Sequence, residues 1–159
     1  MIASFFLFLA TTCDPSVICT ELQEIRPFVD ARLKTCERIV EVAEEFKIDP
    51  VILVAVGWHE SRFNNEAISR SGARGALQVL PRWWCGSQKC DFLFVGGRAF
   101  TRWYARAARK HKRNTLFYAL AMYNGGNSPG ARSERYARKV MKTAKLLRRR
   151  LRICGVPGC

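Results

Sequence analysis

The fold of this chain is decided by one continuous run, Asp49-Pro50-Val51-Ile52-Leu53-Val54-Ala55-Val56-Gly57-Trp58-His59-Glu60-Ser61. Asp49 can accept a hydrogen bond from the first turn of a helix, and proline is favoured at the first helical position. The residues that follow are apolar on nearly every side of a helix, which indicates burial in a protein core. The run therefore predicts a buried helix over Val51–Glu60.

Glu60 lies in the last turn of this expected helix. The carbonyl end of a helix carries about half a negative charge, and an apolar environment removes water from a carboxyl group. Both effects disfavour the carboxylate, so we expect a raised pKa for Glu60 and a group that can donate a proton near neutral pH. The alternative is an ordinary glutamate that leaves the helix end for solvent.

Helical periodicity is also present on both sides of this run. Further helices are expected over Pro27–Lys47, Arg98–Lys110, Thr115–Tyr123 and Glu134–Ile153. The segment Arg62–Pro81 is rich in polar residues and glycine, which predicts loops and a short hairpin around Gly72–Val79. We therefore expect a mainly α domain with a short loop or β-hairpin wall beside a cleft.

Two adjacent tryptophans, Trp83 and Trp84, lie in an expected loop after this wall. Their rings could stack on sugar faces, but large aromatic side chains are more often buried in a core. We expect a core role for both.

The charge of the chain points to an anionic partner. Its 159 residues suit one domain, and 27 Lys and Arg against 13 Asp and Glu give a formal net charge of +14. Basic residues gather in the second half, above all between Arg135 and Arg152. Nucleic acid and a bacterial wall with peptide carboxylates and phosphate polymers both attract such a protein, and a merely solvated helix face is the third interpretation.

The seven cysteines predict disulfides and an oxidising compartment. The count is odd, and six remain if Cys13 is removed or acylated. Spacing suggests three pairs: Cys85 with Cys90, Cys154 with Cys159, and, as the remainder, Cys19 with Cys36. Zinc is the competing interpretation, but the close pairs lack the usual two-residue gap and only His59 and His111 could assist. We expect no metal and no other cofactor.

The N-terminus has the length of a secretory signal. The stretch Ile2–Ala10 is apolar and too short to cross a bilayer as a helix, although no Lys or Arg precedes it. Cys13 follows only a loose lipoprotein-type cleavage pattern. We expect a leader over residues 1–19, a folded domain over residues 20–153 and a cysteine-containing tail over residues 154–159. A buried N-terminal strand or helix is the alternative.

Three sequence blocks resemble the lytic transglycosylase family, in its soluble-transglycosylase (SLT)-like catalytic domain, which is related in fold to goose-type lysozyme. They are Glu60-Ser61 with Phe63-Asn64, then Ser69, Gly72, Gly75, Gln78 and Pro81, and lastly Tyr123-Asn124-Gly125. Each block is weak alone, but their order and spacing are specific. The resemblance implies that residues 20–153 form an α+β lysozyme-like domain that acts on peptidoglycan.

The same resemblance implies a mechanism with a single catalytic acid, Glu60. It would protonate the glycosidic oxygen between N-acetylmuramic acid and N-acetylglucosamine and then take the proton of the muramic 6-hydroxyl, which closes a 1,6-anhydro ring. Neither water nor a second carboxylate is then required, unlike the usual two-carboxylate scheme. The later acids Glu66, Asp91 and Glu134 lie in no recognisable partner motif, with Asp91 the best candidate for a second acid.

Roles for neighbouring residues follow from the resemblance as well. Ser61 would support the surroundings of the acid, and Ser69 and Gln78 would line the sugar site. Tyr123 would direct its hydroxyl toward Glu60 and the sugar, and Asn124 would contact the acetamido group or hold the loop. Gly72 and Gly75 would allow a tight turn and a close approach of the backbone to the sugar chain. For each polar residue the alternative is a local hydrogen bond. We expect Gln78 to present both a donor and an acceptor to the sugar.

Two other functions stay open from the sequence. One is a muramidase of the same fold that adds water, and the other is a cationic protein that has lost catalysis and binds wall, membrane or nucleic acid. The expected partners are peptidoglycan glycan strands and the anionic wall surface, with a phage particle or a secretion apparatus as further candidates and no specific nucleic acid. The expected location is extracytoplasmic, in the periplasm or cell envelope, or in a phage virion.

Overall fold

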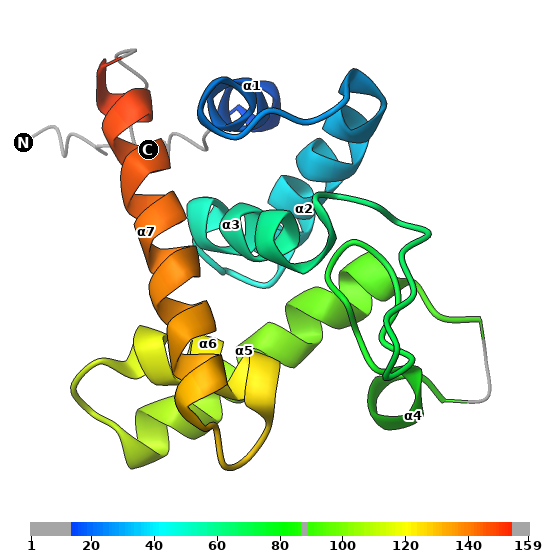
Figure 1. Cartoon of the computed structure of the whole chain (residues 1–159), viewed down its shortest axis with the longest axis vertical. Helices are drawn as coiled ribbons and strands as arrows, with labels where there is room; N and C mark the ends of the chain where they lie inside the picture. The colour runs from blue at the N-terminus through cyan, green and yellow to red at the C-terminus, as the bar shows by residue number, and fades with distance from the viewer. Residues whose placement is uncertain (1–13, 87–88, 154–159) are drawn as a thin grey trace, which may run out of the picture.

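The computed structural model describes residues 14–86 and 89–153, which form an assembly of helices (Figure 1). In chain order these are α1 (Pro15–Ile25), the 3-10 helix η1 (Asp30–Arg32), α2 (Leu33–Glu45), α3 (Pro50–Ser61), α4 (Pro81–Trp84), α5 (Phe92–Lys110), α6 (Thr115–Gly125) and α7 (Ala131–Ile153). The expected mainly α fold is confirmed.

Helix α3 lies near the centre of the domain and packs against α2 and α7 (Figure 1). Asp49 begins it as expected, because its side chain accepts a hydrogen bond of 3.0 Å from the Val51 amide and Pro50 takes the first helical position. The run Val51–Val56 is buried throughout. The prediction of a buried central helix is confirmed.

Helices α5, α6 and α7 form the second part of the domain, in which α6 packs against both of the others. The inner side of α7 is apolar and buried, with Ala137, Val140, Ala144, Leu147 and Leu151 in the core, while its basic residues lie mainly on the outer side. Among the described residues, no helix is both long enough and apolar enough to cross a membrane.

Two helix boundaries differ most from the expected ones. Asp91 accepts hydrogen bonds from the amides of Leu93 and Phe94 at 3.0 and 3.1 Å, so α5 begins at Phe92 instead of Arg98. The expected helix from Pro27 begins only at Leu33, after the turn of η1. The Asp91 cap thus sets the start of α5, which periodicity alone places six residues later.

The segment between α3 and α5 also differs from expectation. The hairpin expected around Gly72–Val79 is present only as isolated bridges, in which Arg74 pairs with Ile68 and with Val79. The tryptophans lie in the short helix α4 instead of a loop. The expected core role is wrong for Trp83, which is 71% exposed, whereas Trp84 is half-buried against the core.

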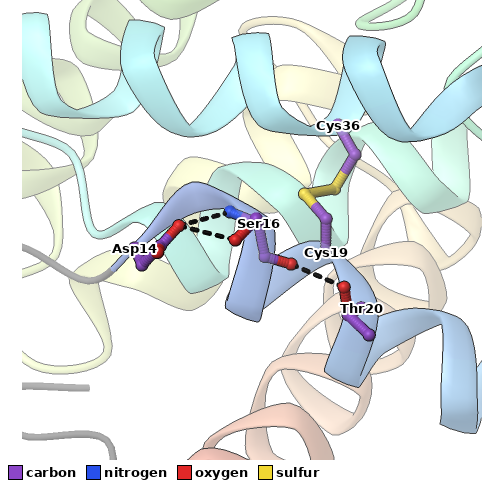
Figure 2. The surroundings of a disulfide bond; sticks show 5 residues. All are labelled: Asp14, Ser16, Cys19, Thr20 and Cys36. Atoms are coloured by element: carbon purple, nitrogen blue, oxygen red, sulfur yellow. Dashed lines mark hydrogen bonds between the residues drawn. A yellow bond between two sulfur atoms is a disulfide. The ribbon is translucent and has the colours of Figure 1, made fainter.

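Helix α1 is held to α2 by the disulfide between Cys19 and Cys36 (Figure 2). Asp14 caps α1 by accepting hydrogen bonds from the Ser16 amide and hydroxyl at 2.9 and 2.7 Å, and Cys19 is fully buried. The expected leader over residues 1–19 therefore overlaps the start of a packed helix. The three segment boundaries stay a prediction.

The second disulfide among the described residues joins Cys85 to Cys90, as expected. The expected pairing of Cys154 with Cys159 lies outside the described residues, as do Cys13 and most of the expected leader.

Removing the Cys19–Cys36 disulfide by the double replacement Cys19→Ala and Cys36→Ala should lower the free energy of unfolding by about 3 kcal/mol, since a loop of this length restricts the unfolded chain. The two residues are 17 positions apart, against 5 for Cys85 and Cys90. The matched control, Cys85→Ala with Cys90→Ala, should lose about 1 kcal/mol less. Urea denaturation measures both, and an equal or larger loss in the control would contradict the argument.

Candidate active site

Glu60 lies in the last turn of α3, which ends in an abrupt change of direction. Arg62 and Phe63 both have positive φ, 53° and 63°, and their amides donate to the carbonyls of Trp58 and Gly57. Such a backbone costs an L-residue roughly 1 kcal/mol or more at each position. Burial of Phe63, whose ring packs edge-on against Phe28 at 5.0 Å, opposes that cost and fixes the turn that follows the acid.

The Glu60 carboxyl is surrounded by protein, although part of the residue stays exposed. Loss of water raises its pKa from 4.5 to about 7, and the hydroxyl of Tyr136 lowers it in part. The expectation of a raised pKa is confirmed. At pH 7 the group is therefore divided between the acid that donates a proton and the base that accepts one.

Two tyrosines lie beside this carboxyl. The Tyr123 hydroxyl donates to the Leu77 carbonyl at 2.7 Å, while the buried Tyr136 hydroxyl forms no hydrogen bond of ordinary geometry. Burial raises the pKa of both phenols well above its usual value, and the charge of Glu60 raises it further. Both hydroxyls therefore keep their protons. That of Tyr136 can be donated to the Glu60 carboxylate as it forms, whereas that of Tyr123 is already donated to Leu77.

Sequence reasoning missed Tyr136 as a site residue, because it is only one position within the helix expected over Glu134–Ile153. It lies in the second turn of α7, far along the chain from Glu60. The available signal was a phenol on an otherwise aliphatic stripe, because a buried hydroxyl needs a polar neighbour.

Glu60 opens into a pocket of about 680 Å³ with a basic lining. Its walls include Arg26 from the end of α1 and Lys139, Lys142 and Thr143 from α7. Among the described residues that line it, Glu60 is the only acid. A single carboxyl in a basic pocket suits chemistry in which negative charge develops on the substrate or on the acid itself.

His59, also in this pocket, is a neutral structural residue. Its Nε2 lies 2.9 Å from the Thr143 hydroxyl, and burial, followed by the charges of Arg26 and Lys139, lowers its pKa. The imidazole therefore joins α3 to α7 and adds no positive charge near pH 7.

Asp91 and Glu66, the acids weighed as partners of Glu60, are placed elsewhere. Asp91 caps α5 through both of its hydrogen bonds, and Glu66 is exposed on the loop after α3. Asp91 as a second catalytic carboxylate is therefore corrected to a helix cap.

The loop between α3 and α4 uses its polar side chains to hold its own shape. Ser61 donates to the Ala76 carbonyl at 3.0 Å and accepts from the Asn64 amide at 2.9 Å, and Ser69 accepts from the Ala73 amide at 3.0 Å. These local bonds support the loop against the end of α3. Contact of Ser69 with a sugar stays a prediction.

Gln78 is also engaged in the loop. Its side-chain nitrogen donates to the carbonyls of Ala67 and Gly75 at 3.2 and 2.9 Å. The expectation that Gln78 offers a free donor is therefore corrected, because both amide hydrogens are used. Its side-chain oxygen has no donor among the described residues and is the atom left for a ligand.

Gly72 and Gly75 both have a left-handed backbone, with φ of 82° and 76°. Their close approach to a sugar chain stays a prediction. A Cβ on Gly75 would lie 2.8 Å from the Phe92 Cβ, so the loop approaches the start of α5 closely there. A Cβ on Gly72 would meet no atom within 4 Å. The two glycines share a conformation and differ in the space around them.

Tyr123 connects the acid to a second groove, of about 700 Å³. Its ring contributes to the wall, together with exposed Asn124 and the side chains of α4 and α5. Trp84 and Trp103 meet there edge to face, with ring centroids 6.5 Å apart. The structure thus brings Tyr123 and Asn124 to one aromatic groove. Gln78 lies in the loop that Tyr123 contacts through the Leu77 carbonyl.

A mainly helical domain with one buried acid at a helix end beside an aromatic groove is of the lysozyme-like class. Residues 37–84 match the model of the Transglycosylase SLT domain, from α2 through α4, including Glu60 and Gln78. No curated protein matches the chain. This match over residues 37–84 supports an SLT-like lytic transglycosylase domain, and at family level it indicates an enzyme that cleaves glycosidic bonds.

Alanine at Gly72 and at Gly75 should separate the cost of a left-handed backbone from the cost of a steric clash with Phe92. Gly72→Ala should lower the free energy of unfolding by about 1 kcal/mol, the cost of a left-handed L-residue. Gly75→Ala should cost at least twice as much, because its methyl group also meets Phe92. Urea unfolding of the pair tests this, and equal losses would show that crowding at Gly75 is relieved freely.

Glu60 should make the protein less stable as pH rises from about 4.5 to 8. The unfolded glutamate ionises near 4.5 while the folded one holds its proton to about 7, so unfolding releases a proton between these values. Relative to Glu60→Gln, the wild type should lose about 3 kcal/mol of unfolding free energy over that range. Denaturation at several pH values measures it, with exposed Glu66→Gln as the control, and parallel curves for wild type and Glu60→Gln would contradict the raised pKa.

Proposed function

We propose that this protein is a peptidoglycan lytic transglycosylase that cleaves the MurNAc-β-1,4-GlcNAc bond and leaves a 1,6-anhydro-MurNAc end. The observation that carries the proposal is the Glu60 carboxyl, whose pKa burial raises to about 7 at the mouth of a basic pocket. The SLT-domain match and the helical fold support the same reaction class.

In the proposed first step, Glu60 gives its proton to the glycosidic oxygen as the bond to the muramic anomeric carbon breaks. The electron pair of that bond goes to the leaving N-acetylglucosamine hydroxyl, and Glu60 becomes a carboxylate. The Tyr136 hydroxyl lies beside this carboxylate, and the Tyr123 phenol is close enough to feel its charge. A donor already in place, here the Tyr136 hydroxyl, stabilises developing charge without rearrangement.

In the second step, the carboxylate takes the proton of the muramic 6-hydroxyl, whose oxygen forms the new bond to the anomeric carbon. One residue thus acts first as acid and then as base. A pKa near 7 suits both roles, because the group can give up and take back a proton near neutral pH. Glu60 then returns to its protonated form.

An intramolecular hydroxyl as nucleophile is consistent with the lack of a second acid in the described lining of the Glu60 pocket and the aromatic groove. A hydrolase of the usual type needs a second carboxylate across the bond to activate water or attack carbon. Among the described residues that line the pocket and the aromatic groove, no second acid is present. The hydrolytic muramidase is therefore the second candidate.

The proposed location is extracytoplasmic, with delivery either by export or in a phage virion. Two disulfides among the described residues suit an oxidising environment, and a formal net charge of +14 suits an anionic wall. A phage particle and a secretion apparatus are the alternative settings for such an enzyme.

Mass spectrometry of muropeptides released from purified peptidoglycan tests this proposal. The wild type should release products one water lighter than reducing muropeptides, and Glu60→Gln should release none, because an amide of similar shape cannot donate the proton. The control, exposed Glu66→Gln, should match the wild type. Reducing products would assign a muramidase, and unchanged turnover by Glu60→Gln would defeat the role of Glu60.

A further inference from the structure

The aromatic groove beside Tyr123 carries a row of arginines that the proposed chemistry does not use. Arg102, Arg106 and Arg109 line it from α5. Their spacing of four and three residues places them along one face of the helix, over about 10 Å. We call these three residues with Trp84 and Trp103 the arginine groove.

The arginines of this groove have no anionic partner in the described part of the chain. None of the ion pairs there includes them, and no acid lines the groove. Arg102 lies over the Trp84 ring at 5.8 Å, an arrangement that leaves its guanidinium hydrogens available. Arg98, on the same helix, differs because it donates to the Trp84 carbonyl at 2.6 Å.

Arg106 gives the strongest sign of a missing ligand. Its Nε is buried and has no hydrogen-bond partner. A buried guanidinium hydrogen without an acceptor is costly, and three like charges along one helix face repel one another. An anion with planar oxygen pairs would relieve both, because the guanidinium fork matches a carboxylate bidentately.

We propose that the arginine groove binds the free carboxylates of the peptide stems on peptidoglycan, so that the protein acts on peptide-bearing strands in preference to bare glycan. This rests on the proposed function, since Tyr123 lines the groove and is also near enough to Glu60 for the carboxylate charge to act on its phenol. A ligand that reaches the arginines while its sugars lie along Trp84 and Trp103 must carry its carboxylates on the glycan itself. Peptide stems meet that condition.

Calorimetric binding to soluble glycan fragments tests the proposal in the Glu60→Gln background, where the fragments stay intact. Fragments with peptide stems, each of which carries several carboxylates, should bind about tenfold or more tightly than the same fragments after amidase removal of the stems, which leaves one lactyl carboxylate on each muramic residue. Adding Arg102→Gln, Arg106→Gln and Arg109→Gln should remove this preference and leave the affinity for bare glycan within about twofold. Equal affinity of the parent for both fragments would overturn the proposal.

The matched control removes three charges outside the groove, through Lys145→Gln, Arg149→Gln and Arg152→Gln on α7. It should weaken both fragments alike and keep their ratio, since general attraction does not distinguish a positioned carboxylate. Equal loss of preference in the control would overturn the site. If replacing Arg106 disturbs folding, the double variant of exposed Arg102 and Arg109 should still lower the preference at least threefold, and an unchanged ratio there would overturn the proposal.

The same variants distinguish the other outcomes. If replacing the three groove arginines weakens binding of a DNA duplex and leaves the preference for peptide stems unchanged, the groove is assigned to nucleic acid and the proposal is overturned. A stem preference without any wall cleavage would leave the groove standing while the proposed function fails. Wall cleavage without any preference for peptide stems would support the proposed function and overturn the proposal for the arginine groove.

Discussion

The whole structure depends on the burial of α3. Its residues from Val51 to Val56 are apolar on every side, so other parts of the fold must cover each face. Helices α2 and α7 pack against it, and the loop after α3 folds back through Ser61 to Ala76. A carboxyl at the end of such a helix cannot keep its hydration, and the raised pKa of Glu60 follows from the same burial that forms the core.

Loss of water is the main determinant of the Glu60 pKa, even though the pocket that Glu60 lines is basic. Lys139, Lys142 and Arg26 line the pocket, yet burial decides the direction of the Glu60 pKa shift and the Tyr136 hydroxyl opposes it. Lys139 and Lys142 are exposed, so water screens their charges from the buried acid. Burial therefore leaves a substantial fraction of Glu60 protonated near neutral pH when a substrate arrives.

Sequence reasoning predicted the features that depend on local pattern. The cap at Asp49, the buried run, the rise in the Glu60 pKa and the pairing of Cys85 with Cys90 follow from residue type and spacing. Features that depend on the path of the chain in space were missed. Gln78 spends its amide hydrogens on loop carbonyls, Trp83 is turned outward by α4, and Tyr136 meets Glu60 only because α7 crosses α3. A one-dimensional pattern contains no information about which distant group a side chain will face.

Asp49 has a second contact, an ion pair with Arg148 of α7, that reaches beyond the start of α3. Further along the same two helices, Thr143 meets His59 and Tyr136 lies beside Glu60. These three polar contacts are spread over about 18 Å of α7, so a slide of one helical turn, about 5.4 Å, would break all of them together. These contacts therefore fix the register of α7 on α3. The Asp49–Arg148 ion pair at one end helps to determine where the Tyr136 hydroxyl meets the Glu60 carboxyl at the other end.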